Sequence, residues 1–143
     1  MQQGDFFKLP DINPDELSPA VWAYIGDAVY ELFIRCHLLA DGPAKTKTLH
    51  HEATEMVRAS FQAGLVSQIE SFLTENEMEI LKRGRNVKSG HIPAHTDVLT
   101  YRYSTAFEAL LGYLYLHGEW QRLHELLAQV ININQSRITE HPD

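Results

Sequence analysis

Apolar residues recur three and four positions apart through most of this 143-residue chain, which is the spacing typical of helices. The first helix is predicted between a Ser18-Pro19 start, where a hydroxyl cap precedes a proline in the first turn, and a stop at Asp41-Gly42-Pro43. The stripe expected to face the core consists of Ile25, Ala28, Val29 and Leu32.

The same pattern predicts five further helices. A second helix is expected from near Thr48 with a bend or break near Gly64, and a third over residues 65–72. The TENE sequence at Thr74–Glu77 is a capping box and predicts the start of a fourth helix. After a polar loop, two apolar helices are expected. Their core residues are Phe107, Leu110, Leu111, Leu114 and Tyr115 in one, and Trp120, Leu123, Leu126, Leu127 and Val130 in the other.

No segment alternates long enough to require a strand, so the fold class is predicted to be all-α with one domain. Residues 1–17 are polar and are expected to form an N-terminal arm, residues 18–133 the domain, and residues 134–143 a C-terminal tail.

Composition narrows the class of protein further. The chain is 44% apolar and 22% charged, as in ordinary globular domains. It has one cysteine, Cys36, which excludes a disulfide framework and a cysteine-based zinc site and is interpreted as a small buried apolar residue. The first residues do not read as a signal peptide, and no apolar stretch is long enough to cross a bilayer. We therefore expect a cytoplasmic protein without membrane contact.

Two acidic residues interrupt the most apolar helices. Asp27 follows Gly26 within the first helix, and Glu108 lies between Phe107 and Ala109 in the fifth. Each could face solvent or be a satisfied core acid, or the two could converge on a divalent cation. Mg²⁺ prefers carboxylate oxygens and often takes only one or two of them, with water and phosphate completing its shell. Gly26 would allow another backbone or a phosphate to approach closely.

A basic cluster contrasts with the net charge of −7. Four of the 12 Lys and Arg residues lie in the segment KRGRNVKSG, at a predicted helix end. They could complement the helix dipole, or they could bind phosphates together with nearby polar and basic residues. The expected phosphate-binding set is Lys82, Arg83, Arg85, Asn86, Lys88, Ser89 and Arg102. Gly84 and Gly90 suggest a loop that moves.

The two acidic segments resemble a known family. AYIGDAVYELFIR and AFEALLGYLYL are similar to the two acidic motifs of the ribonuclease III catalytic domain. With KRGRNVKSG and TDVLTYRYSTAFEALLGYL they resemble the Mini-ribonuclease III subfamily, which lacks an appended RNA-binding domain. The resemblance covers residues 18–131 and implies an all-α endonuclease domain that pairs as a symmetric homodimer.

The resemblance also implies the site residues. Asp27 matches the catalytic aspartate and Glu108 the metal-binding glutamate, so both are expected to bind Mg²⁺, with Mn²⁺ able to substitute. Family acids are replaced at three other positions, by Ala20, Ala23 and Thr105. With fewer carboxylates, we expect more water ligands and weaker metal binding without RNA.

The implied activity is endonucleolytic cleavage of double-stranded RNA, leaving 5′-phosphate and 3′-hydroxyl ends. The implied substrate is the precursor of 23S ribosomal RNA, with a ribosomal protein as a candidate helper that presents it. The alternative is a catalytically impaired domain that only binds RNA or protein. Ala20, Ala23 and Thr105 favour this alternative, whereas Asp27 and Glu108 oppose it.

Overall fold

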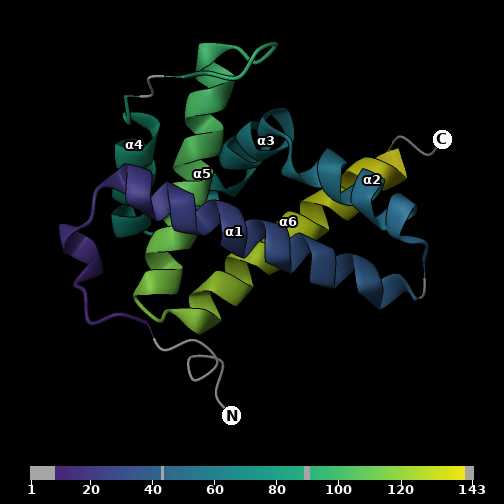
Figure 1. Cartoon of the computed structure of the whole chain (residues 1–143), viewed down its shortest axis with the longest axis horizontal. Coiled ribbons are helices and arrows are strands. Elements are labelled where there is room, and N and C mark those ends of the chain that lie inside the picture. The colour runs from purple at the N-terminus through teal and green to yellow at the C-terminus, as the bar shows by residue number, and fades with distance from the viewer. Residues whose placement is uncertain (1–8, 43, 89–90, 141–143) are drawn as a thin grey trace.

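The computed structural model describes residues 9–42, 44–88 and 91–140, and these residues form helices and connecting loops without a strand (Figure 1). The predicted all-α class is confirmed. The α-helices are α1 (Pro19–Leu38), α2 (Thr46–Val57), α3 (Ala59–Ile69), α4 (Glu75–Arg85), α5 (Val98–Leu116) and α6 (Trp120–Glu140). Short 3₁₀ turns are η2 (Pro14–Glu16), η3 (Leu39–Asp41) and η4 (Glu70–Phe72).

The starts of α1 and α4 are capped as the sequence predicted. The Ser18 hydroxyl accepts from the backbone N–H of Val21 and caps α1, with Pro19 in the first turn. Thr74 and Glu77 form the predicted capping box of α4. Each cap satisfies backbone donors that a helix start leaves without partners.

Helix α5 is the central element, because α1, α3, α4 and α6 all contact it. Its buried residues cover nearly its whole circumference, as expected for a helix surrounded by others. They are Ser104, Ala106, Phe107, Ala109, Leu110, Leu111, Gly112 and Leu114. The four apolar residues from Phe107 to Leu114 predicted for this core are thus confirmed, and Glu108 lies within this run.

Helices α1 and α5 cross with their backbones in direct contact. A Cβ atom on Gly26 would lie 1.7 Å from the carbonyl oxygen of Glu108, and one on Gly112 would lie 1.8 Å from the carbonyl oxygen of Trp22. Neither position has room for a side chain. The close approach expected at Gly26 is therefore to the backbone of α5.

A second glycine contact joins α4 to α5. A Cβ atom on Gly84 would lie 2.7 Å from the Cβ atom of Ala109. Gly84 is buried within the last turn of α4, so its interpretation as part of a moving loop is wrong. Gly90 lies outside the described residues.

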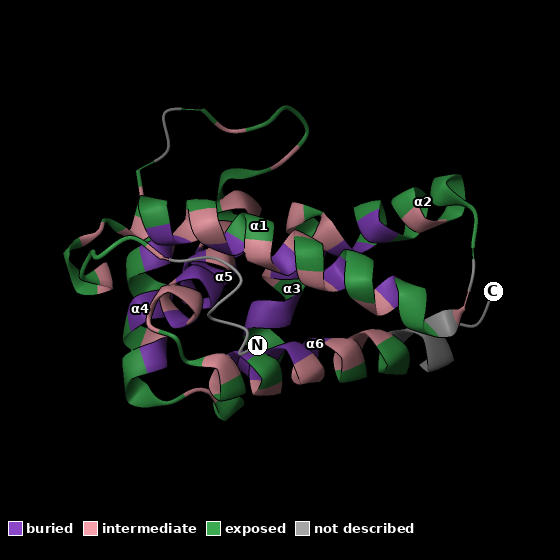
Figure 2. Cartoon of the chain, turned by 60° about the horizontal axis from the view of Figure 1, so that its bottom comes forward, coloured by how far each residue is buried: buried purple, intermediate pink, exposed green. Residues whose placement is uncertain are grey.

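The predicted core stripe of α1 is also wrong for most of its residues, since only Val29 of the four packs, partly buried, against the core. The buried residues of α1 are Trp22, Gly26, Tyr30, Ile34 and Leu38, and Figure 2 shows how buried and exposed positions alternate along the helix. Leu32, a predicted core residue, is 62% exposed, and Cys36 is exposed rather than buried. Apolar residues surround most of α1, so the contact at Gly26 decides which side faces α5.

The chain turns between α2 and α3 at Arg58, and not near Gly64. Arg58 is extended, with φ −62° and ψ 146°, and Gly64 lies exposed inside α3. The hydroxyl of buried Tyr30 donates to the carbonyl of Met56 at 2.8 Å. Tyr30 thus satisfies an oxygen that a continuous helix would have bonded itself.

The two ends of the described chain pack against or continue the domain, where the sequence predicted a separate arm and tail. Residues 1–8 lie outside the described residues, but Pro14 and Asp15 are bonded to the domain. Trp22 Nε1–H donates to the Pro14 carbonyl at 2.8 Å, and the Tyr113 hydroxyl donates to Asp15 at 3.1 Å. Helix α6 continues through residues 134–140, which the sequence predicted to be part of a tail. Among the described residues, no helix has the length and apolar character needed to span a bilayer.

We predict that Gly26→Ala destabilises the protein by about 3 kcal/mol or more, because the added methyl group must push two backbones apart. Gly64→Ala is the matched control. Nothing lies within 4 Å of a Cβ atom there, so it should stabilise the exposed helix by about 0.5–1 kcal/mol. Urea unfolding measures both changes. Equal stability of the two variants would contradict the backbone contact.

Candidate active site in a cleft between α1 and α5

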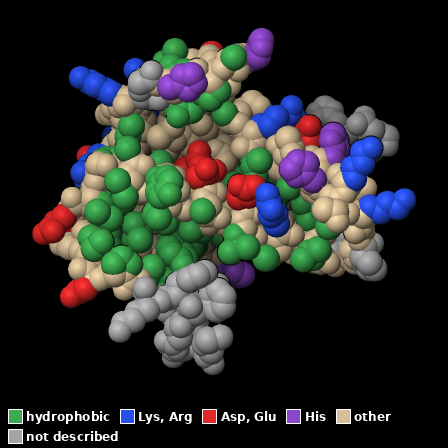
Figure 3. All heavy atoms as spheres, viewed as in Figure 1, with side chains coloured by type: hydrophobic (Ala, Val, Ile, Leu, Met, Phe, Trp, Pro, Cys, Tyr) green, Lys and Arg blue, Asp and Glu red, His purple; other side chains and the backbone are tan. Residues whose placement is uncertain are grey.

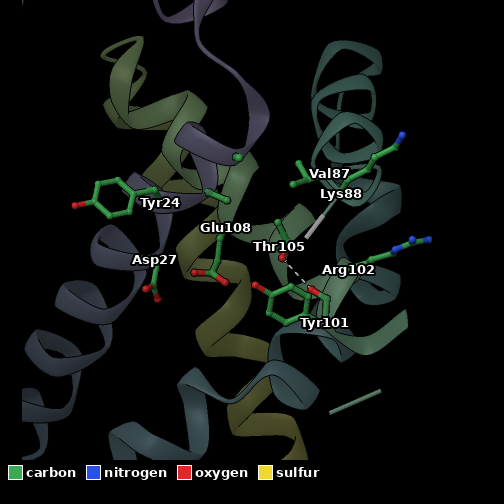
Figure 4. Close-up of a pocket in the computed structure, with 10 residues that line it drawn as sticks. Tyr24, Asp27, Val87, Lys88, Tyr101, Arg102, Thr105 and Glu108 are labelled. Atoms are coloured by element: carbon green, nitrogen blue, oxygen red, sulfur yellow. Dashed lines mark hydrogen bonds between the residues drawn. The ribbon is translucent and has the colours of Figure 1, made fainter. Parts of the chain in front are cut away.

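A cleft of about 520 Å³ opens where the first half of α1 faces the first half of α5 (Figure 4). It is lined by Ala20, Ala23, Tyr24, Asp27, Val87, Lys88, Tyr101, Arg102, Thr105 and Glu108. One helical face of α1 and one of α5 supply most of this lining, since the lining positions on each helix recur at intervals of three or four residues.

Asp27 and Glu108 meet in this cleft although they are 81 positions apart in the sequence. Gly26 rests on the carbonyl of Glu108, so the next residue of α1 lies beside the side chain of Glu108. The carboxyl group of Glu108 lies close enough to Asp27 for the two groups to interact electrostatically. Asp27 is exposed and Glu108 is half-buried, so both avoid the core despite their apolar neighbours in the sequence.

Burial is the largest cause that raises the pKa of Glu108 from 4.5 to about 9, and the charge of Asp27 and its hydrogen bond act in the same direction. A raised pKa of this size favours the protonated form of Glu108 at neutral pH. The negative charge of Glu108 also contributes to raising the pKa of buried Tyr30, after burial itself. A divalent cation would replace that proton and relieve the repulsion between the carboxylates.

The donor set fits Mg²⁺ better than zinc. Two carboxylates facing an open cleft leave positions for water and phosphate oxygens, which suits a hard octahedral cation. Across residues 9–42, 44–88 and 91–140, no group of three or more His, Cys, Asp or Glu side chains could hold a metal. A closed tetrahedral site is therefore not formed by those residues.

The basic residues expected to bind phosphate are divided by the structure. Lys88 and Arg102 line the cleft, with their charged ends directed away from the two carboxylates (Figure 4). Lys82, Arg83 and Arg85 instead lie in the last turn of α4, so the expected loop begins later than Lys82.

Two of the remaining members have structural contacts. The Arg83 guanidinium lies 4.8 Å from the centre of the Trp22 ring, a cation–π contact between α4 and α1. Asn86 is the C-cap of α4 and accepts from Arg85 Nε at 3.4 Å. Ser89 lies outside the described residues. The helix-end placement foreseen from the sequence is thus found for Lys82, Arg83 and Arg85, whereas phosphate binding by the cluster stays a prediction.

Two residues of the cleft, Tyr24 and Tyr101, are not among the site residues expected from the sequence. The structure puts both in the cleft. Their spacing from the acids could have predicted this position, because Tyr24 precedes Asp27 by three residues and Tyr101 precedes Glu108 by seven. Both intervals return to the same side of a helix.

Comparisons with known proteins agree with this geometry. The family model of the ribonuclease III domain matches residues 20–119. A Mini-ribonuclease 3 of Thermoanaerobacter sp. is 47% identical over 82% of this chain and 82% of its own. One from Desulfitobacterium hafniense is 49% identical over 80% of this chain and 73% of its own. A Fusobacterium nucleatum protein of known crystal structure superposes with a TM-score of 0.75 at 30% identity, covering 83% of this chain and 95% of that one.

The chain belongs to the ribonuclease III domain family, a class of endoribonucleases, and within it to the Mini-ribonuclease 3 group. The resemblance noted in the sequence is thereby confirmed.

We predict that Glu108→Gln stabilises the metal-free protein at neutral and alkaline pH. Between the unfolded pKa near 4.5 and the folded pKa of about 9, the native state binds a proton that the unfolded chain has released, so stability falls as pH rises. The variant lacks this group, and its gain should reach about 1–3 kcal/mol near pH 8–9 and shrink toward pH 4–5.

The measurement is the melting temperature in EDTA across that pH range. Glu79→Gln, which removes an exposed glutamate from α4, is the control and should be near neutral. A gain for Glu108→Gln that does not depend on pH would contradict the raised pKa of Glu108.

Proposed function

We propose that this protein is a Mg²⁺-dependent endoribonuclease that cleaves double-stranded RNA, with Asp27 and Glu108 holding the cation and Mn²⁺ able to substitute. The observation that carries the proposal is the meeting of these two carboxyl groups in one open cleft. Family membership supports the class of reaction, and the cleft provides the residues proposed to perform it.

The reaction follows from what lines the cleft. Mg²⁺ bound there would supply Lewis-acid activation of water and neutralise charge on the scissile phosphate. Asp27 and Glu108 would hold the cation, and the open side of the cleft would admit a phosphate oxygen of the RNA strand. Lys88 and Arg102 add positive charge at the rim, where the neighbouring phosphates of the strand would lie. The expected products carry 5′-phosphate and 3′-hydroxyl ends.

The proposed substrate is the precursor of 23S ribosomal RNA in the cytoplasm, presented with the help of a ribosomal protein. A-form RNA is read mainly by shape, because side chains cannot reach into its deep, narrow major groove. A domain of this size would select a duplex by its geometry and by the contacts of Lys88, Arg102 and the residues around them. Sequencing the ends of ribosomal precursor RNA after incubation with the purified protein tests this assignment.

The proposed assembly is a homodimer. Apolar side chains of α1 and its C-cap that do not face α5 remain exposed, among them Tyr24 at 77%, Leu32 at 62% and Leu39 at 58%. Hydrophobic side chains gather on this face over the first half of α1 and the segment before it (Figure 3). An exposed apolar surface of this kind suits a second copy, which would bury it symmetrically.

A catalytically impaired binding domain is the second candidate. The observation that favours it is the cleft lining itself, since Ala20, Ala23 and Thr105 occupy positions where the wider family has acids. Cleavage of duplex RNA in Mg²⁺ and its absence in EDTA would exclude this candidate. Binding without cleavage under both conditions would support it.

We predict that Asp27→Asn abolishes cleavage and leaves the fold intact, because the amide keeps the shape of the side chain and removes the charge that binds the cation. A loss of at least 10³-fold in rate is expected on the order of typical metal-ligand removals. Glu31→Gln is the control, since it lies one turn further along α1, paired with Arg35 and outside the cleft. Normal cleavage by Asp27→Asn would show that the active site has been misplaced.

We predict that the cations at the cleft bind RNA more than those on α4 do. Lys88→Ala with Arg102→Ala should reduce the slope of log affinity against log salt by about 0.7–0.9 for each phosphate that is no longer bound. Lys82→Ala with Arg85→Ala, a matched pair on the last turn of α4, should change it less. Binding of RNA to the Asp27→Asn protein across a salt series measures both. Equal slopes for the two pairs would contradict this division.

We predict that Leu32→Glu separates the dimer, because it places a charge in the apolar interface. Leu99→Glu is the control, since Leu99 is similarly exposed, at 59%, but lies on α5. Sedimentation should give about twice the 16.3 kDa chain mass for the wild type and the control. A wild-type monomer would contradict the proposed dimer.

A further inference from the structure

Tyr101 has a position in the cleft that the proposed function does not use. It lies two helical turns before Glu108 on α5 and is half-buried in the lining of the cleft. Its hydroxyl points toward the carboxyl group of Glu108 (Figure 4). A phenol can donate a hydrogen bond to a carboxylate, and it carries no charge of its own near neutral pH.

The other donors of the described lining are directed elsewhere. The Thr105 hydroxyl donates to the backbone carbonyl of Tyr101 at 3.0 Å. The charged ends of Lys88 and Arg102 point away from the carboxylates, and so does the ring of Tyr24, which is 77% exposed (Figure 4). Tyr101 is therefore the lining side chain whose donor is aimed at Glu108.

An ionised Glu108 needs such a donor. The charged neighbour that acts on it is Asp27, which is also a carboxyl group and repels an ionised Glu108. A carboxylate that ligates a metal is commonly held in orientation by a hydrogen bond from a second residue, and removing that residue typically weakens metal binding by about 10–100-fold. The cleft offers two carboxylates, so the orientation of each should matter more than in a site with four.

We propose that Tyr101 is a positioning residue of the metal site: its hydroxyl donates to the carboxylate of Glu108 and holds it in the orientation that binds the cation. The inference rests on the proposed metal site formed by Asp27 and Glu108. Tyr101 acts through Glu108 and not through contact with RNA.

The test compares Tyr101→Phe with Tyr103→Phe, a matched change two residues further along α5 that lies outside the cleft lining. Mn²⁺ binding without RNA is followed by electron paramagnetic resonance of the free ion. Tyr101→Phe should bind Mn²⁺ about 10–100-fold more weakly than the wild type. The Mg²⁺ concentration that gives half-maximal cleavage should rise by a similar factor, while Tyr103→Phe should remain within about twofold in both.

Two results overturn the inference alone. Equal Mn²⁺ affinity in Tyr101→Phe and Tyr103→Phe removes the proposed role. Unchanged Mn²⁺ affinity with a raised KM for duplex RNA assigns Tyr101 to RNA binding instead. Asp27→Asn, measured in parallel, separates these from failure of the proposed function. If that variant binds Mn²⁺ as tightly as the wild type, the metal site itself is wrong, and the inference falls with it.

Discussion

The backbone contact between α1 and α5 at Gly26 and Gly112 is the constraint on which the rest of the structure depends. Each glycine faces a carbonyl oxygen of the other helix, at positions where a Cβ atom would lie 1.7 or 1.8 Å from it. This crossing fixes the rotation of α1 about its own axis. It directs Trp22 and Tyr30 into the core, and it brings Asp27 beside Glu108.

The same crossing explains why acids are tolerated on apolar helices. Asp27 and Glu108 leave the core on one side of the crossing and meet in the cleft, so neither carboxyl group is enclosed in the core. Their mutual repulsion remains, and it raises the pKa of Glu108 together with burial. The pair of acids therefore lowers stability as the pH rises toward the pKa of Glu108, and a cost of this kind is common at functional sites.

Stability comes from contacts away from the cleft. Arg122 of α6 donates two hydrogen bonds to Glu77 at 2.8 Å and one to the carbonyl of Phe72 at 2.7 Å. These bonds lower the pKa of Glu77 although its burial opposes the shift. The pair joins α6 to the capping box of α4, and Tyr30 packs edge-to-face with Phe107 at 5.2 Å in the core. These contacts stabilise the fold enough to tolerate the repulsion between the two acids in the cleft.

The sequence predicted the features that depend on local chemistry. Caps at Ser18 and Thr74 need only neighbouring residues, and α5 is apolar on almost every side, so its burial requires no knowledge of its partners. Two acidic residues in the middle of apolar helices predicted a shared site, and the structure brings Asp27 and Glu108 together.

The features that depend on tertiary contact could not be predicted. A hydrophobic pattern gives glycine no weight, so it placed the core face of α1 on the wrong side. The buried stripe instead includes Gly26, which lies between Trp22 and Tyr30 along it. The turn at Arg58 depends on the hydroxyl of Tyr30, which donates to the carbonyl of Met56, 26 residues later in the sequence.

The most direct test is crystallographic: the location of Mn²⁺, by anomalous scattering, in crystals of the wild-type protein soaked in the ion. We expect one ion in each cleft, with an oxygen of Asp27 and an oxygen of Glu108 both at roughly 2.1–2.2 Å, the distance of hard oxygen ligands. An ion bound to one carboxylate alone, or located away from the crossing of α1 and α5, would contradict the claim that the Gly26–Gly112 contact builds the metal site.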